Sequence, residues 1–427
     1  MAVFVAEGGP QQRITDTQAR TLLADALDRV PDTSRVLAIP PDTTRSESRG
    51  GALTSMLYDL LGRQEPFHVL PALGTHNPMG PQEIDGFFGS TIPPSDFIEH
   101  KWREELHRFG NVPSDFVHEV SGDALKPDLP DYDIPVEINK NLVGGDYTAM
   151  FSIGQVVPHE VIGMANGVKN VLVGTGGQET INKSHFLGAA YGLERMMGRI
   201  DTPVRRVMNY AHEHYLEELG IIYILTVVEP RADGEPVLRG LYIGDDLKTF
   251  EKAARLSQQV NLTLLEEPLE KTVVYLSPDE FKSTWLGNKA IYRTRMAMAD
   301  DGELIVLGPG VEAFGEDPEI DRLIREYGYR GTPATLKAVR ENDELRDNLA
   351  AAAHLIHGSS EGRFQITYAT DPDLLGREEV ENVGFEWMDV HEALEMYPTE
   401  ELTEGWNDGF FYVSNPALGL WALEEDF

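Results

Sequence analysis

The sequence predicts an α/β protein made of two domains with largely parallel sheets and an active site in the cleft between them. Three observations support this prediction. The chain has 427 residues, of which 41% are apolar, so it is too long for one ordinary hydrophobic core. Short runs rich in β-branched residues alternate with longer amphipathic segments, a pattern typical of parallel sheets covered by helices. Polar side chains follow several of these runs directly, where open α/β sheets bind their ligands.

Each short apolar run predicts a strand, because it is rich in β-branched residues and turn-forming residues flank it. The predicted strands cover residues 36–39, 67–70, 147–153, 170–173, 221–228, 273–276, 303–307 and 364–368. The amphipathic segments predict helices at residues 51–61, 184–197, 203–219, 247–259, 318–327 and 345–356, and Gln82 and Glu83 seed a further one. A Glu-Glu-Pro turn places the domain boundary near residues 265–271. We therefore predict an N-terminal domain over residues 1–268, completed by residues 408–427, and a C-terminal domain over residues 269–407 that closes over the substrate.

Composition excludes several classes of function. A formal charge of −35 repels nucleic acid and anionic lipid, both of which need basic surfaces. The absence of cysteine excludes disulfides, thiol nucleophiles and cysteine-bound metal centres. The first ten residues lack the basic and apolar regions of a signal peptide, and the longest strongly apolar run, residues 221–228, is far shorter than a membrane span. We expect a soluble cytoplasmic protein.

Two familiar motifs are absent. Gly174-Thr-Gly-Gly177 has neither the spacing of a dinucleotide-binding fingerprint nor that of a P-loop. His212-Glu-His214 is not a zincin motif, and its two histidines face different sides of a helix, so we expect a solvated helix surface there.

Three segments place polar residues where a strand should end. Asp42-Thr-Thr-Arg45 brings together hydroxyls, a guanidinium and free backbone N–H groups that suit phosphate or carboxylate, although, taken alone, an N-cap beside a surface arginine is the better explanation. His76 lies between turn-forming residues and could be a general acid/base or metal ligand, although, taken alone, an ordinary turn histidine is the better explanation. In the third segment, His159 and Lys169 lie ten residues apart among apolar and small residues. Such groups are costly to bury without partners, so a functional role is the better interpretation.

Taken together, these segments resemble a known family, the nickel-pincer-nucleotide-dependent lactate racemases and their relatives. The resemblance runs from about residue 36 to residue 310. Its ordered signatures are Asp-x-Thr-Arg at 42–45, Gly-x-His-x-Pro at 74–78, Ile-Asn-Lys at 138–140, Pro-His at 158–159, Lys169 and His185. The resemblance implies a cofactor derived from nicotinic acid mononucleotide that holds nickel through sulfur, carbon and sulfur. Such a cofactor would supply the sulfur ligands that a chain without cysteine lacks.

The resemblance implies roles for four residues of the reaction centre. Lys169 matches the lysine that can attach the cofactor covalently through a thioamide, and His185 matches the protein ligand of nickel. His76 and His159 match the paired acid/base histidines on opposite faces of the substrate.

Other positions match the surroundings of that centre. Arg45 matches an arginine that holds the substrate carboxylate. Asp42, Thr44 and Gly167 fall at positions beside the cofactor, and the Ile-Asn-Lys signature at 138–140 falls at a structural or supporting position.

The chain also departs from the family. Asn166-Gly-Val-Lys169 stands where lactate racemase has Gly-Gly-x-Lys, which would loosen the backbone around the attachment point. Arg293 and Met296 stand where a glutamine and a lysine help to hold lactate. Tyr292, Arg293 and Arg295 are therefore candidate substrate contacts, although both arginines equally fit surface positions that balance the acidic exterior. We expect a substrate larger than lactate.

The implied activity is racemisation or epimerisation at C2 of a 2-hydroxy acid, by hydride transfer through a 2-keto acid. Two bases are needed because the hydroxyl lies on opposite sides in the two isomers. The expected partners are the small hydroxy acid and the cofactor-synthesis enzymes, without nucleic acid or membrane, and the sequence leaves the oligomeric state open. Two other functions also remain open. One is a hydrolase or lyase whose three histidines, His76, His159 and His185, bind zinc or manganese directly. The other is a non-catalytic carrier of the nickel nucleotide.

Overall fold

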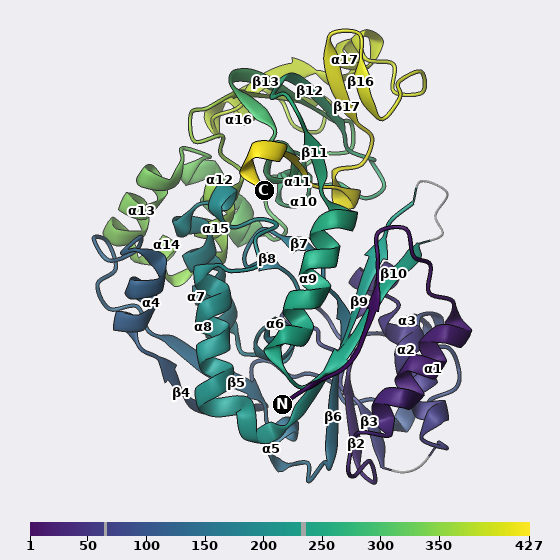
Figure 1. The fold of residues 1–427 in the computed structure, drawn as a ribbon. Helices are drawn as coiled ribbons and strands as arrows, with labels where there is room; N and C mark the ends of the chain where they lie inside the picture. The colour runs from purple at the N-terminus through teal and green to yellow at the C-terminus, as the bar shows by residue number, and fades with distance from the viewer. Residues whose placement is uncertain (64–65, 232–235) are drawn as a thin grey trace. The chain divides into compact units, whose positions relative to one another are not determined.

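The computed structural model describes residues 1–63, 66–231 and 236–427, and the prediction of an α/β protein with largely parallel sheets is confirmed. By its internal contacts the chain divides into two compact units, which we describe separately (Figure 1). Unit 1 comprises residues 1–123, 131–184 and 197–261, and unit 2 comprises residues 124–130, 185–196 and 262–427.

Unit 1 is built on a six-stranded sheet of order β1-β10-β9-β6-β2-β3. Its strands are β1 (Val3–Gly8), β2 (Val36–Ile39), β3 (Phe67–Val69), β6 (Ala149–Gln155), β9 (Ile221–Glu229) and β10 (Val237–Gly244). The four strands β9, β6, β2 and β3 run parallel, and β10 and β1 extend the sheet in antiparallel fashion. All four residues of β2 are buried, as expected for the centre of a parallel sheet that is covered on both faces.

Helices cover both faces of this sheet (Figure 1). The helices of unit 1 are α1 (Asp16–Leu27), α2 (Gly50–Leu60), α3 (Pro81–Phe88), α4 (Ser114–Ser121), α5 (Asn141–Gly144), α6 (Val168–Leu172), α8 (Pro203–Ala211) and α9 (Leu247–Asn261), while α7 (Gln178–Tyr191) continues into unit 2. Two hairpins complete the unit, β4 (Leu106–Val112) with β5 (Ile134–Asn139) and β7 (Pro158–His159) with β8 (Gly163–Met164). Helices α1 and α2 pack on one face, and α9 packs on β9 and β10 from the other.

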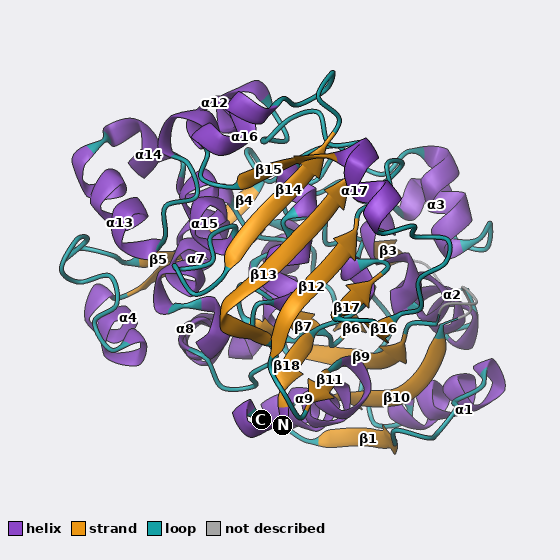
Figure 2. Cartoon of the chain, turned by 90° about the horizontal axis from the view of Figure 1, so that it is seen from above, coloured by secondary structure: helices purple, strands orange, loops and turns teal. Residues whose placement is uncertain are grey.

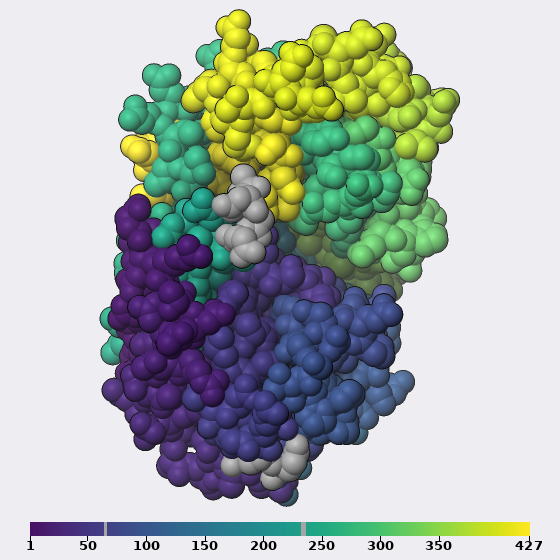
Figure 3. Space-filling view, turned by 90° about the vertical axis from the view of Figure 1, so that its right-hand side faces the viewer, coloured from purple at the N-terminus to yellow at the C-terminus, as the bar shows by residue number. Residues whose placement is uncertain are grey.

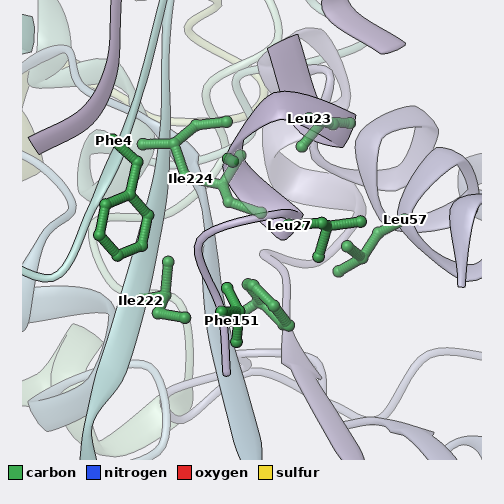
Figure 4. Close-up of a pocket in the computed structure, with 10 residues that line it drawn as sticks. Phe4, Leu23, Leu27, Leu57, Phe151, Ile222 and Ile224 are labelled. Carbon is green, nitrogen blue, oxygen red and sulfur yellow. The ribbon is translucent and has the colours of Figure 1, made fainter. Parts of the chain in front are cut away.

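An apolar pocket lies between α1, α2 and the sheet, and Figure 4 shows the side chains that line it. All ten lining residues are apolar, and seven of them are labelled in the figure: Phe4, Leu23, Leu27, Leu57, Phe151, Ile222 and Ile224. Most of them belong to the hydrophobic core of the unit. The pocket offers no polar group to a ligand, so it is a packing feature of the core.

The N-terminal residues form part of the surface of unit 1, as the purple atoms in Figure 3 show. Helix α1 begins there with a capping box, in which the Thr15 hydroxyl accepts a hydrogen bond from the Gln18 backbone and the Gln18 side chain accepts one from the Thr15 backbone. These reciprocal bonds satisfy two of the backbone donors that a helix leaves exposed at its start. No helix in the described part of the chain is long and apolar enough to cross a bilayer.

Unit 2 contains a second six-stranded sheet, of order β15-β14-β13-β12-β17-β16 (Figure 2). Its strands are β12 (Leu269–Tyr275), β13 (Met298–Gly308), β14 (Gln365–Thr370), β15 (Glu386–Asp389), β16 (Gly405–Asn407) and β17 (Phe410–Val413). All are parallel except β16 at the edge. The helices are α10 (Thr284–Gly287), α11 (Lys289–Thr294), α12 (Pro318–Tyr327), α13 (Thr332–Glu341), α14 (Asp343–Asp347), α15 (Leu349–His357), α16 (Arg377–Asn382) and α17 (Val390–Met396).

The C-terminal segment belongs to unit 2, which differs from the predicted return of residues 408–427 to the N-terminal domain. The reason is strand pairing. Strand β17 joins the second sheet beside β12, and β18 (Trp421–Leu423) pairs with β11 (Thr263–Leu265). The contact boundary near residue 261 also lies slightly before the predicted one at residue 268.

Two local predictions are wrong. Residues 170–172 form the end of helix α6, with Val173 as its C-cap, and not a strand, because a short buried apolar run has no periodicity that distinguishes the two. His212 is buried instead of solvated. It opens a π-helical turn at His212–Leu216 that widens the helix by one residue, whereas His214 remains exposed.

Candidate active site

The predicted site residues of unit 1 follow the carboxyl ends of neighbouring parallel strands. From β2 the chain crosses to β3 on one side, whereas from β6 it crosses to β9 on the other side. Because β2 and β6 are direct neighbours, the segments that follow them leave in opposite directions. This arrangement is the topological switch point at which open α/β sheets bind ligands. Arg45 follows β2, and His159 and Lys169 follow β6.

The segment after β2 is a short 3-10 turn, Thr43–Ser48, capped by Asp42. The buried Asp42 carboxylate accepts hydrogen bonds from the backbone N–H of Thr44, at 3.2 Å, and from its hydroxyl. Its other oxygen lies 2.6 Å from Nδ1 of His76, which arrives from the segment after β3. The structure thus makes Asp42 the partner of a predicted acid/base histidine, and Arg45 presents an exposed guanidinium on the same turn.

The Asp42 contact fixes the tautomer of His76. Burial alone would raise the pKa of Asp42, but the hydrogen bonds from His76 and Thr44 outweigh it and hold that pKa below its ordinary value of 3.8. An ionised carboxylate can only accept hydrogen bonds, so Nδ1 of His76 must carry the proton. Nε2 of a neutral His76 is then a proton acceptor, as a general base requires.

We expect that Asp42→Asn no longer restricts His76 to the Nδ1–H tautomer, since an asparagine can present either its oxygen or its amide group to Nδ1. The His76 ring should change from the Nδ1–H form to a mixture of both tautomers, which long-range ¹H–¹⁵N spectra measure directly. Loss of a charge-assisted hydrogen bond should also lower the free energy of unfolding by about 1.5–3 kcal/mol. The exposed ion pair of Asp59 with Arg63 supplies the control, because Asp59→Asn should leave the His76 signals unchanged. An unaltered His76 tautomer in Asp42→Asn would contradict the assignment.

His159 is held in the opposite way. It lies buried in the β7–β8 hairpin, and its Nδ1 accepts a hydrogen bond of 3.1 Å from the backbone N–H of Val161. The proton of a neutral His159 is therefore on Nε2. A carboxylate oxygen of Glu160 lies 3.7 Å from the same Nδ1. The two predicted acid/base histidines thus have complementary tautomers, one with a basic Nε2 and the other with Nε2–H.

Lys169 is a half-buried amine at the start of α6. Desolvation has the largest effect on the Lys169 pKa and lowers it. The positive charges of Arg45 and Arg205 lower the pKa further, whereas the Glu160 carboxylate raises it, and the resulting pKa is about 7. A large share of the amine is therefore neutral, and nucleophilic, near pH 7.

The turn before Lys169 is held in one conformation by hydrogen bonds, whereas the Asn166-Gly-Val-Lys169 sequence predicts a looser backbone. Asn166 and Gly167 both have positive φ angles, of 66° and 64°. Asparagine tolerates this left-handed conformation better than most residues, which explains how it replaces a glycine here. The Asn166 side-chain oxygen accepts a hydrogen bond of 2.7 Å from the Gly167 backbone. A side chain at Gly167 is disfavoured by the positive φ angle and by a close approach, since its Cβ would lie 3.0 Å from the Phe250 ring.

The lowered pKa of Lys169 makes a prediction about stability and pH. Below pH 7 the amine is charged in both the folded and the unfolded chain, so the free energy of unfolding is lowered by the full cost of desolvating the charged amine in the folded state. Between pH 7 and the ordinary pKa of 10.5 only the unfolded chain binds the proton, so that cost disappears as the pH rises. Urea unfolding at pH 6 and pH 10 should show Lys169→Met to be stabilising by a few kcal/mol at pH 6, with the gain vanishing by pH 10. The same gain at both pH values would contradict the lowered pKa.

A buried histidine that the sequence analysis missed supports the turn after α6. Nε2 of His100 lies 3.1 Å from the carbonyl oxygen of Gly176, and its Nδ1 lies 3.1 Å from the side-chain amide of Asn139. Asn139 belongs to the Ile-Asn-Lys signature, and its backbone N–H donates to Thr175. Desolvation lowers the pKa of His100, so the neutral ring that this bridge requires is favoured. The signature is therefore a structural support for the segment between Lys169 and α7.

The remaining predicted residues lie in unit 2. His185 is half-buried on α7. Tyr292 and Arg293 are buried on α11, and a nitrogen of Arg293 lies 3.5 Å from the carbonyl oxygen of Gly419. Arg295 is 1% exposed, so the alternative that it is a surface arginine is wrong.

Arg295 already has a partner at each of its three nitrogen atoms. Two contact the Glu194 carboxylate at 2.7 and 2.8 Å, and the third donates to the carbonyl oxygen of Ser359. This buried ion pair lowers the pKa of Glu194, although burial alone would raise it. We therefore assign Arg295 to the internal packing of unit 2.

Two residues near Lys169 were not predicted as part of the site. Glu160 had a signal in the sequence, since a lysine among apolar residues needs a carboxylate partner. Arg205 had none, because an arginine in an amphipathic helix is usually solvated. Among the residues that the structure describes, no group of three or more His, Asp or Glu side chains is arranged to hold a metal ion.

Comparisons with known proteins show similarity in sequence over part of the chain and in fold over almost all of it. Residues 19–195 match the family model of the lactate racemase N-terminal domain. A crystal structure of a protein from Thermotoga maritima is similar over 98% of this chain and 100% of its own, with a TM-score of 0.78 and 25% sequence identity. The lactate racemase apoprotein from Thermoanaerobacterium thermosaccharolyticum is similar over 96% of this chain and 92% of its own, with a TM-score of 0.65 and 16% identity, which establishes a shared fold. A search of curated proteins gave no match.

Proposed function

We propose that this chain racemises or epimerises C2 of a 2-hydroxy acid, with a nickel-pincer nucleotide as cofactor, because residues 19–195 match the lactate racemase N-terminal domain and the fold is shared with a lactate racemase apoprotein. The observation that carries the proposal is the pair of histidines with complementary tautomers beside the switch point of the sheet. Acid/base work on the two faces of one carbon needs one group that accepts a proton and another that supplies one.

The residues present fit the proposed cofactor. The chain contains no cysteine, so sulfur ligands for nickel must come with the cofactor itself. Lys169 offers an amine with a pKa of about 7, which suits covalent attachment to a carboxyl-type group, and His185 would be the protein ligand of the metal. When bound, the cofactor would supply the acceptor and donor for the Cα hydride.

The side chains of unit 1 would handle the protons and the carboxylate. Nε2 of His76 takes the hydroxyl proton of one isomer, and the Asp42 carboxylate 2.6 Å from Nδ1 stabilises the resulting cation. Nε2–H of His159 donates a hydrogen bond to the oxygen of the opposite isomer. To supply a proton to that oxygen, His159 must first bind a second proton at Nδ1, where the Glu160 carboxylate lies 3.7 Å away. After it gives up the Nε2 proton, His159 is neutral with its remaining proton on Nδ1, and its Nε2 can act as the base in the reverse direction. Arg45 would hold the carboxylate through its exposed guanidinium.

The substrate is proposed to be larger than lactate. Arg293 and Met296 replace the glutamine and lysine that the family resemblance places around lactate, so both the hydrogen bonding and the charge of this region differ. A longer or polyhydroxylated acid would use the additional donors of an arginine.

The decisive experiment produces the protein together with the cofactor-synthesis enzymes and offers it lactate and a panel of larger 2-hydroxy and sugar acids in deuterated water. We expect inversion at C2 with the original hydrogen retained, read by chiral chromatography and mass spectrometry. Deuterium at C2 would indicate enolisation instead of hydride transfer. A preference for lactate over every larger acid would contradict the substrate proposal.

Analysis of the same preparation distinguishes the competing functions. Nickel with an extractable nucleotide is expected. Zinc or manganese without any nucleotide would favour the histidine-bound metal enzyme, and bound nickel nucleotide without turnover of any acid would favour a carrier.

A further inference from the structure

The Arg205 side chain contacts the turn that leads to Lys169. It extends from α8 and is only 4% exposed. One terminal nitrogen lies 2.6 Å from the carbonyl oxygen of Met164, and both terminal nitrogens lie 3.1 Å from the carbonyl oxygen of Asn166. The guanidinium stacks on the ring of Phe250 from α9, 3.9 Å from its centroid. Strand β8, the turn at Asn166 and helix α9 therefore all contact this one side chain.

These bonds satisfy the backbone where the turn is most strained. Asn166 and Gly167 have consecutive positive φ angles, a conformation that points the Asn166 carbonyl into the protein. A buried carbonyl without a donor is costly, and a guanidinium can serve two carbonyls at once through its planar fork. A lysine carries the same charge but lacks the planar set of N–H donors that can bind two carbonyl oxygens at once.

Arg205 is also a buried cation without a carboxylate. In the described part of the chain no acidic side chain forms an ion pair with it, and desolvation lowers its pKa to about 9, against the opposing influence of Tyr223. Three charged groups act on the Lys169 amine: Arg45 from the turn after β2, Glu160 from the β7–β8 hairpin, and Arg205 from α8. Two of the three are cations, so the balance favours a neutral amine.

We propose that Arg205 is a positioning residue that fixes the left-handed turn before Lys169 and keeps the Lys169 amine neutral, ready for covalent attachment. The proposal rests on the proposed function in one respect, the use of Lys169 as the attachment point. Removing the guanidinium should act on Lys169 in two ways. The positive charge is lost, and water can enter from the adjoining cavity of about 270 Å³, which Gly167 and Arg205 both line. Both effects favour protonation of the amine.

The test uses the protein without cofactor. Trace acylation with acetic anhydride, in which each modified amine releases one acetate, is measured at Lys169 by peptide mass spectrometry between pH 5.5 and 9.5. In Arg205→Gln the midpoint of Lys169 reactivity should rise by at least about one pH unit, which lowers its reactivity at pH 7 about fivefold. Arg206→Gln is the matched control, since Arg206 is an exposed neighbour paired with Asp201, and it should leave the midpoint unchanged.

A second variant separates charge from geometry. Arg205→Lys keeps the charge and loses the fork, so it should retain a midpoint within about half a unit of the native one, while the backbone amides of residues 167–169 exchange with deuterium faster. If Arg205→Gln folds with an unchanged midpoint, the electrostatic role is wrong. If Arg205→Gln does not fold, Arg205→Lys decides, and native exchange rates at residues 167–169 would overturn the positioning role. Because no hydroxy acid enters these assays, their outcome is independent of whether the proposed racemisation is found.

Discussion

Alanine in place of His76 or of His159 is expected to lower kcat for interconversion of the 2-hydroxy acid at least about 10²-fold in both directions. In the proposed mechanism each histidine serves one face of the reacting carbon, and positioned acid/base groups contribute about 10²–10⁴-fold to such steps. Because interconversion in either direction passes both faces, neither histidine can replace the other. The cofactor content of both variants should remain native, which metal analysis and the visible spectrum would show.

A matched control is available in unit 1. His107 is exposed on β4 and stacks edge-on against Phe109, so His107→Ala should leave kcat unchanged. If His76→Ala or His159→Ala kept activity within about tenfold of native, only about 1.4 kcal/mol of the barrier would depend on that residue. The assignment of two opposed acid/base groups would then be abandoned.

Lys169→Ala is expected to abolish covalent attachment of the cofactor. The native holoprotein should carry a mass increment that corresponds to one nucleotide, and the variant should carry none, because it lacks the amine that forms the bond. Intact-mass spectrometry under denaturing conditions measures the difference directly. Nickel retained after gel filtration should fall as well, by at least about tenfold if attachment is the main anchor.

Lys252 offers the comparison for this variant, since it is exposed on α9. Lys252→Met should keep both the adduct and the nickel. His185→Ala should behave differently from Lys169→Ala, with loss of nickel and retention of the organic adduct. An adduct that persists in Lys169→Ala would place the attachment elsewhere in the chain.

The sequence was sufficient to predict the strands at the centre of each sheet. Residues 36–39, 221–228 and 303–307 are short, rich in β-branched residues and flanked by turns, and all three lie within observed strands. Central parallel strands are buried on both faces, so their apolar runs are continuous and easy to identify. The order of the strands in the sheet was not predicted, because pairing depends on contacts between distant segments.

Local patterns failed where tertiary packing decides the outcome. Residues 170–173 look like a strand, but residues 170–172 belong to helix α6. The helix places Asn170 where its side chain donates 3.0 Å hydrogen bonds to the Ile39 carbonyl and the Ser152 hydroxyl. Those two acceptors come from β2 and β6, more than 100 residues and about 20 residues away in the chain. No local pattern could reveal this bridge.

The hydrogen-bond partners of the site residues could not be predicted from the sequence either. Asp42 was expected beside the cofactor, but its contact with His76 joins two segments that are 34 residues apart. Arg205 lies in an amphipathic helix next to the exposed Arg206, and its role depends on the conformation of Asn166 and Gly167. Motif spacing identified which residues to examine, whereas their tautomers and charges required the three-dimensional contacts.

The strand order of unit 1 also has a consequence for how the protein matures. The pairing of β2 with β6 joins residue 36 to residue 149, and β6 must in turn pair with β9 at residue 221. Contacts of such long sequence separation form late and slowly during folding, because a long loop must be closed before they contribute. The segments that carry Asp42, His76 and Lys169 therefore come together slowly during folding, because the sheet that positions them depends on these long-range pairings. A ligand that contacts all three segments can bind only after β2, β3 and β6 have been synthesised and have paired.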